Sequence, residues 1–199
     1  ITGMVGVPAL WELLERRIRS QVKERGPLFE TAFDLGLEFN RILGRTFGVD
    51  VGETLFGQVH DRLGGNIRFL ISGGAALPKD THSFFAGLGL HLAEGYGLTE
   101  TSPLITINGW QEGHPCKLGS VGRPIPGERV VIDRDAWDDP DSNDGEIVVY
   151  GPNIMLGYWN NPEATAEVMT EDGGFRTGDL GRLDDGFLMI TGRVKEQFK

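Results

Sequence analysis

The stretch 94–101, which reads EGYGLTET, has the highest density of residues that could do chemistry. Two glycines flank Tyr96, and glycine allows the backbone to approach a flat ligand closely. Thr99 and Glu100 follow, a hydroxyl that can donate to a phosphate oxygen and a carboxylate that can bind Mg²⁺. The spacing favours a magnesium-phosphate site. A glycine turn with a packed tyrosine, followed by a Thr–Glu cap, remains the alternative.

Two predicted strands end at glycine turns and bring this stretch to one edge of a sheet. The apolar run 67–72 ends at Gly73 and Gly74, and the run 90–93 ends just before Gly95. A predicted helix over 78–88 joins the two runs as a β-α-β unit. In such sheets ligands bind outside the carboxyl ends of the strands. The pattern therefore predicts a ligand site beside both glycine turns.

The rest of the chain divides by the period of its apolar residues. Helical spacing predicts helices over 8–18 and 28–47, and less regularly over 53–63. After about residue 117 the sequence changes to short strands and turns, which are predicted at 128–133, 145–150 and 187–191, with a helix at 162–169. Glycine and proline interrupt any element near 110–118, where we expect a boundary between subdomains.

Composition and charge exclude several classes of partner. The 199 residues include 19 basic and 29 acidic side chains, so the net charge is −10. Such a chain repels nucleic acid and anionic membranes unless a local basic patch overrides the average. Apolar runs are a handful of residues long, whereas a membrane-spanning helix needs roughly 20. A single cysteine, Cys116, favours a reducing compartment, and we interpret it as an ordinary thiol.

Motif tests exclude several classes of enzyme. The acidic stretch 133–146 does not match a calcium loop, and the four histidines lack metal-ligand spacing. The sequence has no phosphate loop of the G-x-x-x-x-G-K type, no complete dinucleotide fingerprint and no G-x-S-x-G elbow. A hydrolase, a zinc enzyme and a Rossmann dehydrogenase are therefore not expected.

Six motifs occur in order between residues 72 and 196. They are SGGAAL (72–77), YGLTET (96–101), GSVGRP (119–124), GEI (145–147) with GYW (157–159), TGD (177–179) and GRVKE (192–196). This series resembles the adenylate-forming superfamily of acyl-CoA synthetases, luciferases and peptide-synthetase adenylation domains. The segment GVPALW (6–11), followed by a long helical insertion, is similar in particular to long-chain fatty acid–CoA ligases.

The resemblance implies an α/β fold, part of the large N-terminal domain of such an enzyme, with a β-rich, distorted-barrel subdomain. On this reading residues 1–112 are a helical insertion and the α/β part, residues 113–191 are the β-rich subdomain, and residues 192–199 are the hinge to a C-terminal domain. The family's phosphate loop is expected upstream of residue 1 and its C-terminal domain after residue 199. We therefore expect this chain alone not to catalyse the full reaction.

The resemblance implies a reaction in two halves. A fatty acid carboxylate attacks the α-phosphate of MgATP to give an acyl-adenylate and pyrophosphate, and coenzyme A then displaces AMP to leave a thioester. The implied co-substrates and cofactor are ATP, coenzyme A and Mg²⁺, and the partners are small molecules, with no nucleic acid. The implied location is cytoplasmic, with peripheral membrane contact left open.

The resemblance also implies site residues, position by position. The nucleotide site would consist of Gly73, Gly74, Ala75, Glu94, Gly95, Tyr96, Thr99, Asp179, Arg193, Lys195 and Lys199. Within it, residues 73–75 would line one side of the adenine and Tyr96 would stack on it. Asp179 would accept both ribose hydroxyls and Arg193 would also contact the ribose. An aspartate that only forms a turn remains the alternative for Asp179.

The catalytic residues implied are Thr99, which would bind the α-phosphate, and Glu100, which would hold magnesium. Gly95 and Gly97 would border the acyl group. Lys195 and Lys199 would reach the nucleotide from the hinge, although exposed lysines are ordinarily just solvated. Two other functions stay open: a ligase that passes its acyl group to a carrier protein or another acceptor, and a non-catalytic nucleotide-binding domain.

Overall fold

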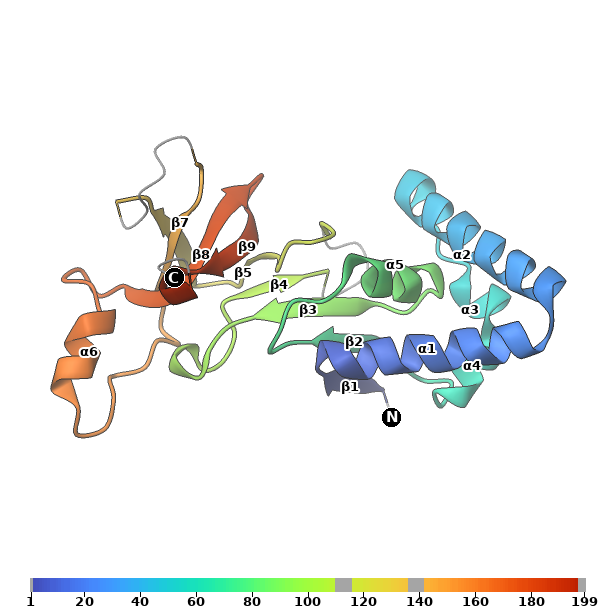
Figure 1. Cartoon of the computed structure of the whole chain (residues 1–199), viewed down its shortest axis with the longest axis horizontal. Helices are drawn as coiled ribbons and strands as arrows, with labels where there is room; N and C mark the ends of the chain where they lie inside the picture. The colour runs from blue at the N-terminus through green and yellow to red at the C-terminus, as the bar shows by residue number, and fades with distance from the viewer. Residues whose placement is uncertain (1, 110–115, 136–141, 197–199) are drawn as a thin grey trace. The chain divides into compact units, whose positions relative to one another are not determined.

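The computed structural model describes residues 2–109, 116–135 and 142–196, which fall into two compact units. Unit 1 comprises Ile1–Glu94 and Gly109–Gly119, and unit 2 comprises Gly95–Asn108 and Ser120–Lys199. Figure 1 colours both units along the chain. The boundary predicted between residues 112 and 113 lies outside the described residues.

Unit 1 contains parallel strands connected by helices. Its elements are β1 (Gly3–Gly6), α1 (Pro8–Glu24), α2 (Pro27–Phe47), α3 (Gly52–Leu55), α4 (Gly57–Arg62), β2 (Phe69–Ser72), α5 (Lys79–Gly87) and the first residues of β3 (Leu92–Tyr96). The strand β2 pairs in parallel with both β1 and β3. The predicted β-α-β unit is therefore confirmed as β2–α5–β3. The sequence did not predict β1, which is four residues long and half glycine.

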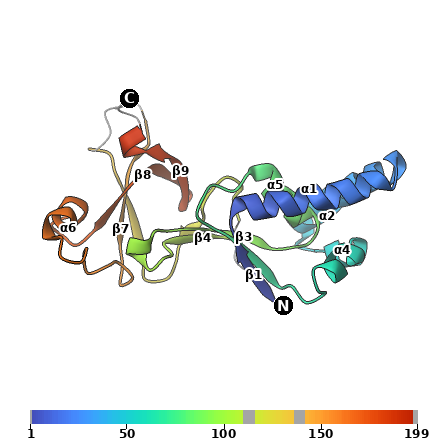
Figure 2. The same cartoon turned by 60° about the horizontal axis from the view of Figure 1, so that its bottom comes forward.

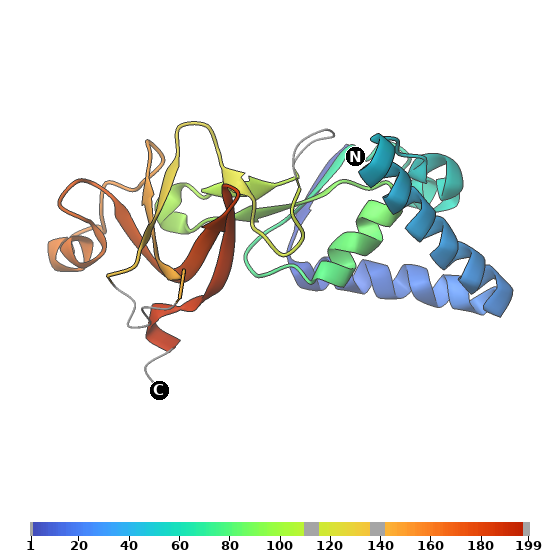
Figure 3. The same ribbon diagram turned by 90° about the horizontal axis from the view of Figure 1, so that it is seen from above.

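Helix α1 extends six residues beyond its predicted end at residue 18, and α2 matches its predicted range to within one residue. Pro8 occupies the first turn of α1, where its missing N–H costs nothing, and the helix continues to Glu24, just before the Gly26–Pro27 break. Figure 3 shows α1 and α2 joined by this short turn, so that the chain reverses direction. Gly48 ends α2 in the left-handed conformation, with φ of 66°.

The core of unit 1 is aromatic. Helices α1, α2 and α5 pack against one another (Figure 2). Fully buried Trp11 of α1 meets Phe85 of α5 edge to face, with ring centroids 5.9 Å apart. Phe33 of α2 meets Phe56 edge to face, with ring centroids 5.1 Å apart, and contacts Phe84 of α5 in a tilted arrangement at 6.4 Å. These helices thus form the support on which β2 and its following glycine turn rest.

Unit 2 is rich in antiparallel strands. Its elements are η1 (Thr99–Thr101), β4 (Thr106–Asn108), β5 (Arg123–Pro124), β6 (Arg129–Asp133), β7 (Gly145–Tyr150), α6 (Pro162–Val168), β8 (Phe175–Asp184), β9 (Phe187–Arg193) and η2 (Val194–Glu196). Strands β6, β7, β8 and β9 form one antiparallel sheet in that order. Its buried core includes Ile105, Ile147, Val149 and Leu188, and Tyr96 packs against them.

The predictions for unit 2 are confirmed for β6, β7, β9 and α6, within a few residues at each end. Strand β8 was not predicted. Its sequence, FRTGDLGRLD, has two glycines and four charged residues, and no continuous apolar alternation. Within the described part of the chain, every helix is too short or too polar to cross a membrane.

Candidate functional site

The motif TGD (177–179) forms a bulge in strand β8. Val148 of β7 pairs with Arg176 and Glu146 pairs with Leu180, so three residues of β8 lie opposite one residue of β7. Thr177 Oγ1 donates to the carbonyl of Ile147 at 2.9 Å and accepts the Asp179 N–H at 3.1 Å. Bulges redirect side chains and are frequent next to active sites. This one determines the direction of Asp179.

The carboxylate of Asp179 is buried and receives two hydrogen bonds. Only 6% of Asp179 is exposed. The Tyr96 hydroxyl donates to Oδ2 at 2.8 Å, and Arg193 Nε donates to Oδ1 at 2.9 Å. Burial, reinforced by the charge of Asp179, raises the pKa of Tyr96, so Tyr96 remains a donor. An ionised carboxylate has about four acceptor positions, which leaves about two for hydroxyls of a ligand.

Glu100 lies in η1 and is held by the segment that follows β7. Tyr158 donates its hydroxyl to Glu100 Oε1 at 2.9 Å, and the Met155 N–H donates to the Glu100 carbonyl at 2.7 Å. The hydrogen bond to Glu100 raises the pKa of Tyr158, which therefore stays protonated at neutral pH. Glu100 and Tyr158 thus form a second polar pair within unit 2.

The donor set around Glu100 fits a magnesium ion that arrives with a phosphate. Among the described residues no three His, Cys, Asp or Glu side chains gather into a metal cage. Glu100 offers one partly exposed carboxylate, of which one oxygen is engaged by Tyr158. Mg²⁺ is commonly bound through one or two carboxylates, with waters and substrate phosphates completing its shell. A single carboxylate is sufficient for that mode.

The other predicted residues of the 95–100 stretch differ in what they contact. Thr99 is exposed beside Glu100, and its hydroxyl bonds to no residue in the described part of the chain. Gly97 is constrained by the chain itself, because a Cβ there would lie 1.8 Å from the carbonyl oxygen of Pro103. The close approach that requires glycine at this position is therefore one of backbone to backbone. The roles of Gly95 and Gly97 at an acyl group remain predictions.

The predicted residues of unit 1 gather at the carboxyl ends of β2 and β3. The Gly73 N–H donates to the Gly6 carbonyl at 3.1 Å, and exposed Gly74 has φ of 83°. Glu94 is 4% exposed, and its Oε1 accepts the N–H of Leu77 at 2.9 Å. Burial raises the pKa of Glu94 to about 7, although the Leu77 N–H opposes this shift. Through this hydrogen bond to Leu77, Glu94 fixes the end of the glycine turn that follows exposed Ala75.

The structure thus brings some predicted residues into contact and leaves others apart. Tyr96 and Arg193 each donate a hydrogen bond to Asp179. Lys195 is exposed in η2 and has no polar contact with a described residue, and Lys199 lies outside the described residues. Gly73, Gly74, Ala75 and Glu94 belong to unit 1 and form a group of their own. The roles of all these residues toward a nucleotide stay predictions.

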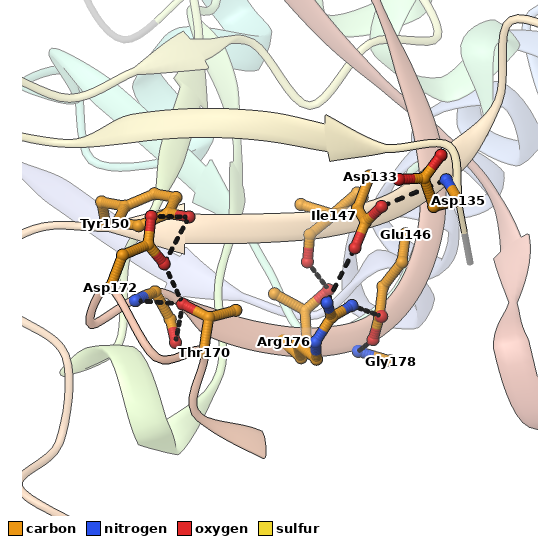
Figure 4. Close-up of polar contacts among 11 residues, drawn as sticks. Asp133, Asp135, Glu146, Ile147, Tyr150, Thr170, Asp172, Arg176 and Gly178 are labelled. Atoms are coloured by element: carbon orange, nitrogen blue, oxygen red, sulfur yellow. Dashed lines mark hydrogen bonds and ion pairs between the residues drawn. The ribbon is translucent and has the colours of Figure 1, made fainter. Parts of the chain in front are cut away.

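Sequence reasoning missed three residues that hold the predicted ones in place. Glu146 and Tyr158 lie inside the GEI and GYW motifs, and Arg176 directly precedes TGD. Figure 4 shows Glu146 between Arg176 and Gly178. The motif positions of Glu146 and Tyr158 were the available signal, but no spacing rule in the sequence shows which side chains will contact the bulge or Glu100 once the chain is folded.

Cys116 fits the interpretation as an ordinary thiol. Its Sγ lies 3.7 Å from Nε2 of His82. Burial lowers the pKa of His82, so the imidazole is neutral at pH 7 and supplies no positive charge to stabilise a thiolate. The pair therefore lacks the electrostatics of a catalytic cysteine.

Comparisons with known proteins identify the family to which the chain belongs. A family model described as AMP-binding enzyme matches residues 1–159. The chain is 44% identical to a long-chain-fatty-acid–CoA ligase, FadD15 of Mycobacterium bovis, over 98% of this chain and 32% of the relative. It therefore spans about a third of the length of that relative.

Two solved structures extend the likeness to the fold. A malonyl-CoA ligase in a ternary product complex with methylmalonyl-CoA and AMP has a TM-score of 0.63 and 33% identity, over 96% of this chain and 34% of that one. The o-succinylbenzoate coenzyme A synthetase MenE of Bacillus subtilis, in complex with AMP, has a TM-score of 0.63 and 27% identity, over 97% of this chain and 31% of that one. The α/β fold class and the resemblance to adenylate-forming ligases are confirmed, and the chain belongs to the AMP-binding enzyme family.

Proposed function

We propose that this chain provides the adenosine-binding part of a long-chain fatty acid–CoA ligase. In the first half-reaction a carboxylate oxygen of the fatty acid attacks the α-phosphorus of ATP, and the bond to the departing pyrophosphate breaks. In the second, the coenzyme A sulfur attacks the acyl carbonyl carbon, its proton is released, and AMP leaves. Enzymes catalyse such transfers mainly by positioning and charge stabilisation.

The observation that carries the proposal is the Asp179 carboxylate. It is buried, oriented by a bulge and fixed by Tyr96 and Arg193, and it retains about two acceptor positions. Two vicinal hydroxyls of a ribose are the donors that such a carboxylate would recognise. In this proposal Tyr96 presents its ring to the adenine while its hydroxyl keeps Asp179 in place.

The proposal gives phosphate and metal roles to the neighbouring turn. Thr99 donates to the α-phosphate, and Glu100, oriented by Tyr158, binds Mg²⁺. When bound, Mg²⁺ neutralises the phosphate charge that develops during transfer. Gly73, Gly74 and Ala75 line the adenine, and Glu94 orders their turn from its far end. Arg193 contacts the ribose next to Asp179.

A long-chain fatty acid is the proposed acyl substrate. The support is the 44% identity to a ligase of that name across nearly the whole chain. The likeness to ligases named for malonate and o-succinylbenzoate is at 33% and 27% identity. The proposal retains a cytoplasmic location, in line with the single cysteine. A carrier-protein ligase would carry out the same first half-reaction with ATP. It would differ in the thiol that accepts the acyl group.

The test is a substrate panel offered to the full natural polypeptide with ATP, Mg²⁺ and coenzyme A. Short, medium and long fatty acids, malonate and o-succinylbenzoate would be compared by pyrophosphate release and by mass of the thioester. We expect kcat/KM to rise toward long chains. Pyrophosphate release without a coenzyme A thioester would favour the carrier-protein alternative, and preference for a dicarboxylate would overturn the long-chain assignment.

A further inference from the structure

We infer that Glu146 is a positioning residue that holds the Thr177–Asp179 bulge in the shape needed for ribose binding. The inference rests on the proposed function, because it assumes that Asp179 contacts the ribose. In the proposed site, Glu146 does not itself contact the nucleotide. It acts from the neighbouring strand β7, through the backbone of Gly178.

Both carboxylate oxygens of Glu146 are engaged by the strand that carries the bulge. Oε1 accepts the Gly178 N–H at 3.2 Å, and Oε2 accepts Nη1 of Arg176 at 2.6 Å. Figure 4 shows the side chain lying between these two partners. Glu146 is only 8% exposed, so water has little access to replace either contact. The carboxylate thus bridges the residue before the bulge and the residue at its centre.

Arg176 extends the bridge to a third strand. Its Nη2 donates to Asp133 Oδ2 at 2.8 Å, at the end of β6. The hydrogen bonds that Arg176 donates to Glu146 and Asp133 raise the pKa of Arg176, so the guanidinium remains charged throughout the working range. Asp133, Glu146 and Arg176 therefore connect β6, β7 and β8 next to the TGD turn.

The bulge needs this support because the regular ladder is interrupted there. Between the Glu146–Leu180 and Val148–Arg176 pairs, Gly178 has no partner residue in the register with β7, its N–H is directed at the Glu146 carboxylate, and its φ is 72°. A partly buried N–H without an acceptor is costly, so the turn would rearrange to find one. Asp179 follows directly, and its carboxylate would move with the turn. A small displacement of a binding group is enough to weaken a pre-organised site.

Four variants of the full natural polypeptide separate this role from general support of the sheet. Glu146→Ala removes the acceptor for Gly178. Glu146→Gln combined with Arg176→Met removes both charges but leaves an amide oxygen free to accept the Gly178 N–H. Asp144→Asn is the matched control, because it breaks the neighbouring 3.0 Å ion pair with Arg182 without touching the bulge. Asp179→Asn reports on the ribose contact itself.

The measurement is calorimetric binding of ATP and of 2′,3′-dideoxy-ATP, which lacks the ribose hydroxyls. We expect Glu146→Ala to raise the Kd of ATP about tenfold while leaving the Kd of the dideoxy analogue unchanged. The Gln–Met double variant should recover most of the ATP affinity, and Asp144→Asn should bind both ligands normally. The KM of the fatty acid should not change in any of these variants.

Other outcomes overturn the inference in distinguishable ways. If Asp179→Asn prefers ATP over the dideoxy analogue by the same factor as the wild type does, the ribose assignment fails. The inference then fails with it. If Asp179→Asn behaves as expected but Glu146→Ala binds ATP normally, or weakens both ligands equally, Glu146 does not position the bulge. Loss of the ATP preference in Asp144→Asn as well would assign the effect to the whole sheet.

Discussion

At the scale of single residues, the central feature is the Asp179 carboxylate, which is buried but still has acceptor positions free for hydrogen bonds. Asp179 accepts a hydrogen bond from the neutral hydroxyl of Tyr96 and another from the cationic guanidinium of Arg193. Hydrogen bonds to a charged acceptor are stronger than those between neutral groups. The carboxylate is therefore held in a defined orientation before any ligand arrives, which lowers the entropic cost of binding.

The first prediction concerns Asp179→Asn. The amide retains one acceptor oxygen but presents an N–H₂ group where the second hydroxyl would donate, so we expect the Kd of AMP to rise about tenfold or more. Isothermal titration calorimetry measures this directly. Asp172→Asn is a matched control, since Asp172 also accepts from a tyrosine, Tyr150 at 3.0 Å, on the surface of unit 2. Equal affinity of Asp179→Asn and wild type would contradict the assignment.

The second prediction concerns Glu94 and pH. Its pKa is about 7 in the folded chain, against 4.5 for the ordinary group, so the folded state retains a proton that the unfolded state releases. Stability therefore falls as pH rises from about 4.5 to about 7, by up to about 3 kcal/mol, and does not fall further for this reason above pH 7.

Denaturant unfolding at several pH values tests this prediction, with Glu94→Gln as the comparison. Glutamine has no carboxyl proton to lose and can still accept the Leu77 N–H, so the stability difference between variant and wild type should grow with pH across this window. A difference that is constant with pH would show that the Glu94 pKa is not raised.

At the scale of elements, the turn after β3 is constrained by its own backbone. Gly97 lies against Pro103, and η1 then carries Thr99 and Glu100 outward. The third prediction is that Gly97→Ala destabilises unit 2 by about 3 kcal/mol, because overpacking against a backbone carbonyl cannot be relieved by a side-chain rotation.

Urea unfolding followed by tryptophan fluorescence would measure the effect of Gly97→Ala. The control is Gly173→Ala, where the added Cβ meets nothing within 4 Å and only the left-handed backbone, φ of 86°, is strained. That control should cost about 1 kcal/mol. Similar losses in the two variants would mean that the approach to Pro103 is not tight.

The sequence predicted the elements whose apolar residues repeat regularly, such as α1, α2 and the β2–α5–β3 unit. It missed β8 because the strand that carries Asp179 is interrupted by the glycines and charges of the bulge itself. The motifs identified Asp179, Tyr96 and Glu100, whereas their partners Arg176, Glu146 and Tyr158 were not assigned roles. Those partners come from other strands and loops, and only the fold brings them within hydrogen-bond distance.

At the scale of the whole molecule, the chain spans about a third of the FadD15 relative that it matches. In the proposed function, the described residues supply contacts for the adenine, for the ribose and for one magnesium ligand. The fourth prediction is that the 199-residue chain by itself forms no acyl-CoA, while the full natural polypeptide does so under the same conditions. Mass spectrometry of the thioester product is the measurement, and robust synthesis by the 199 residues alone would refute the prediction.

The most direct test of the account is exchange of labelled pyrophosphate into ATP by the full natural polypeptide, measured without coenzyme A. This exchange reports formation of an acyl-adenylate and nothing later in the reaction. We predict exchange that depends on a long-chain fatty acid and falls sharply in Asp179→Asn. ATP binding without exchange, for every carboxylic acid offered, would contradict the account and indicate a non-catalytic nucleotide-binding protein.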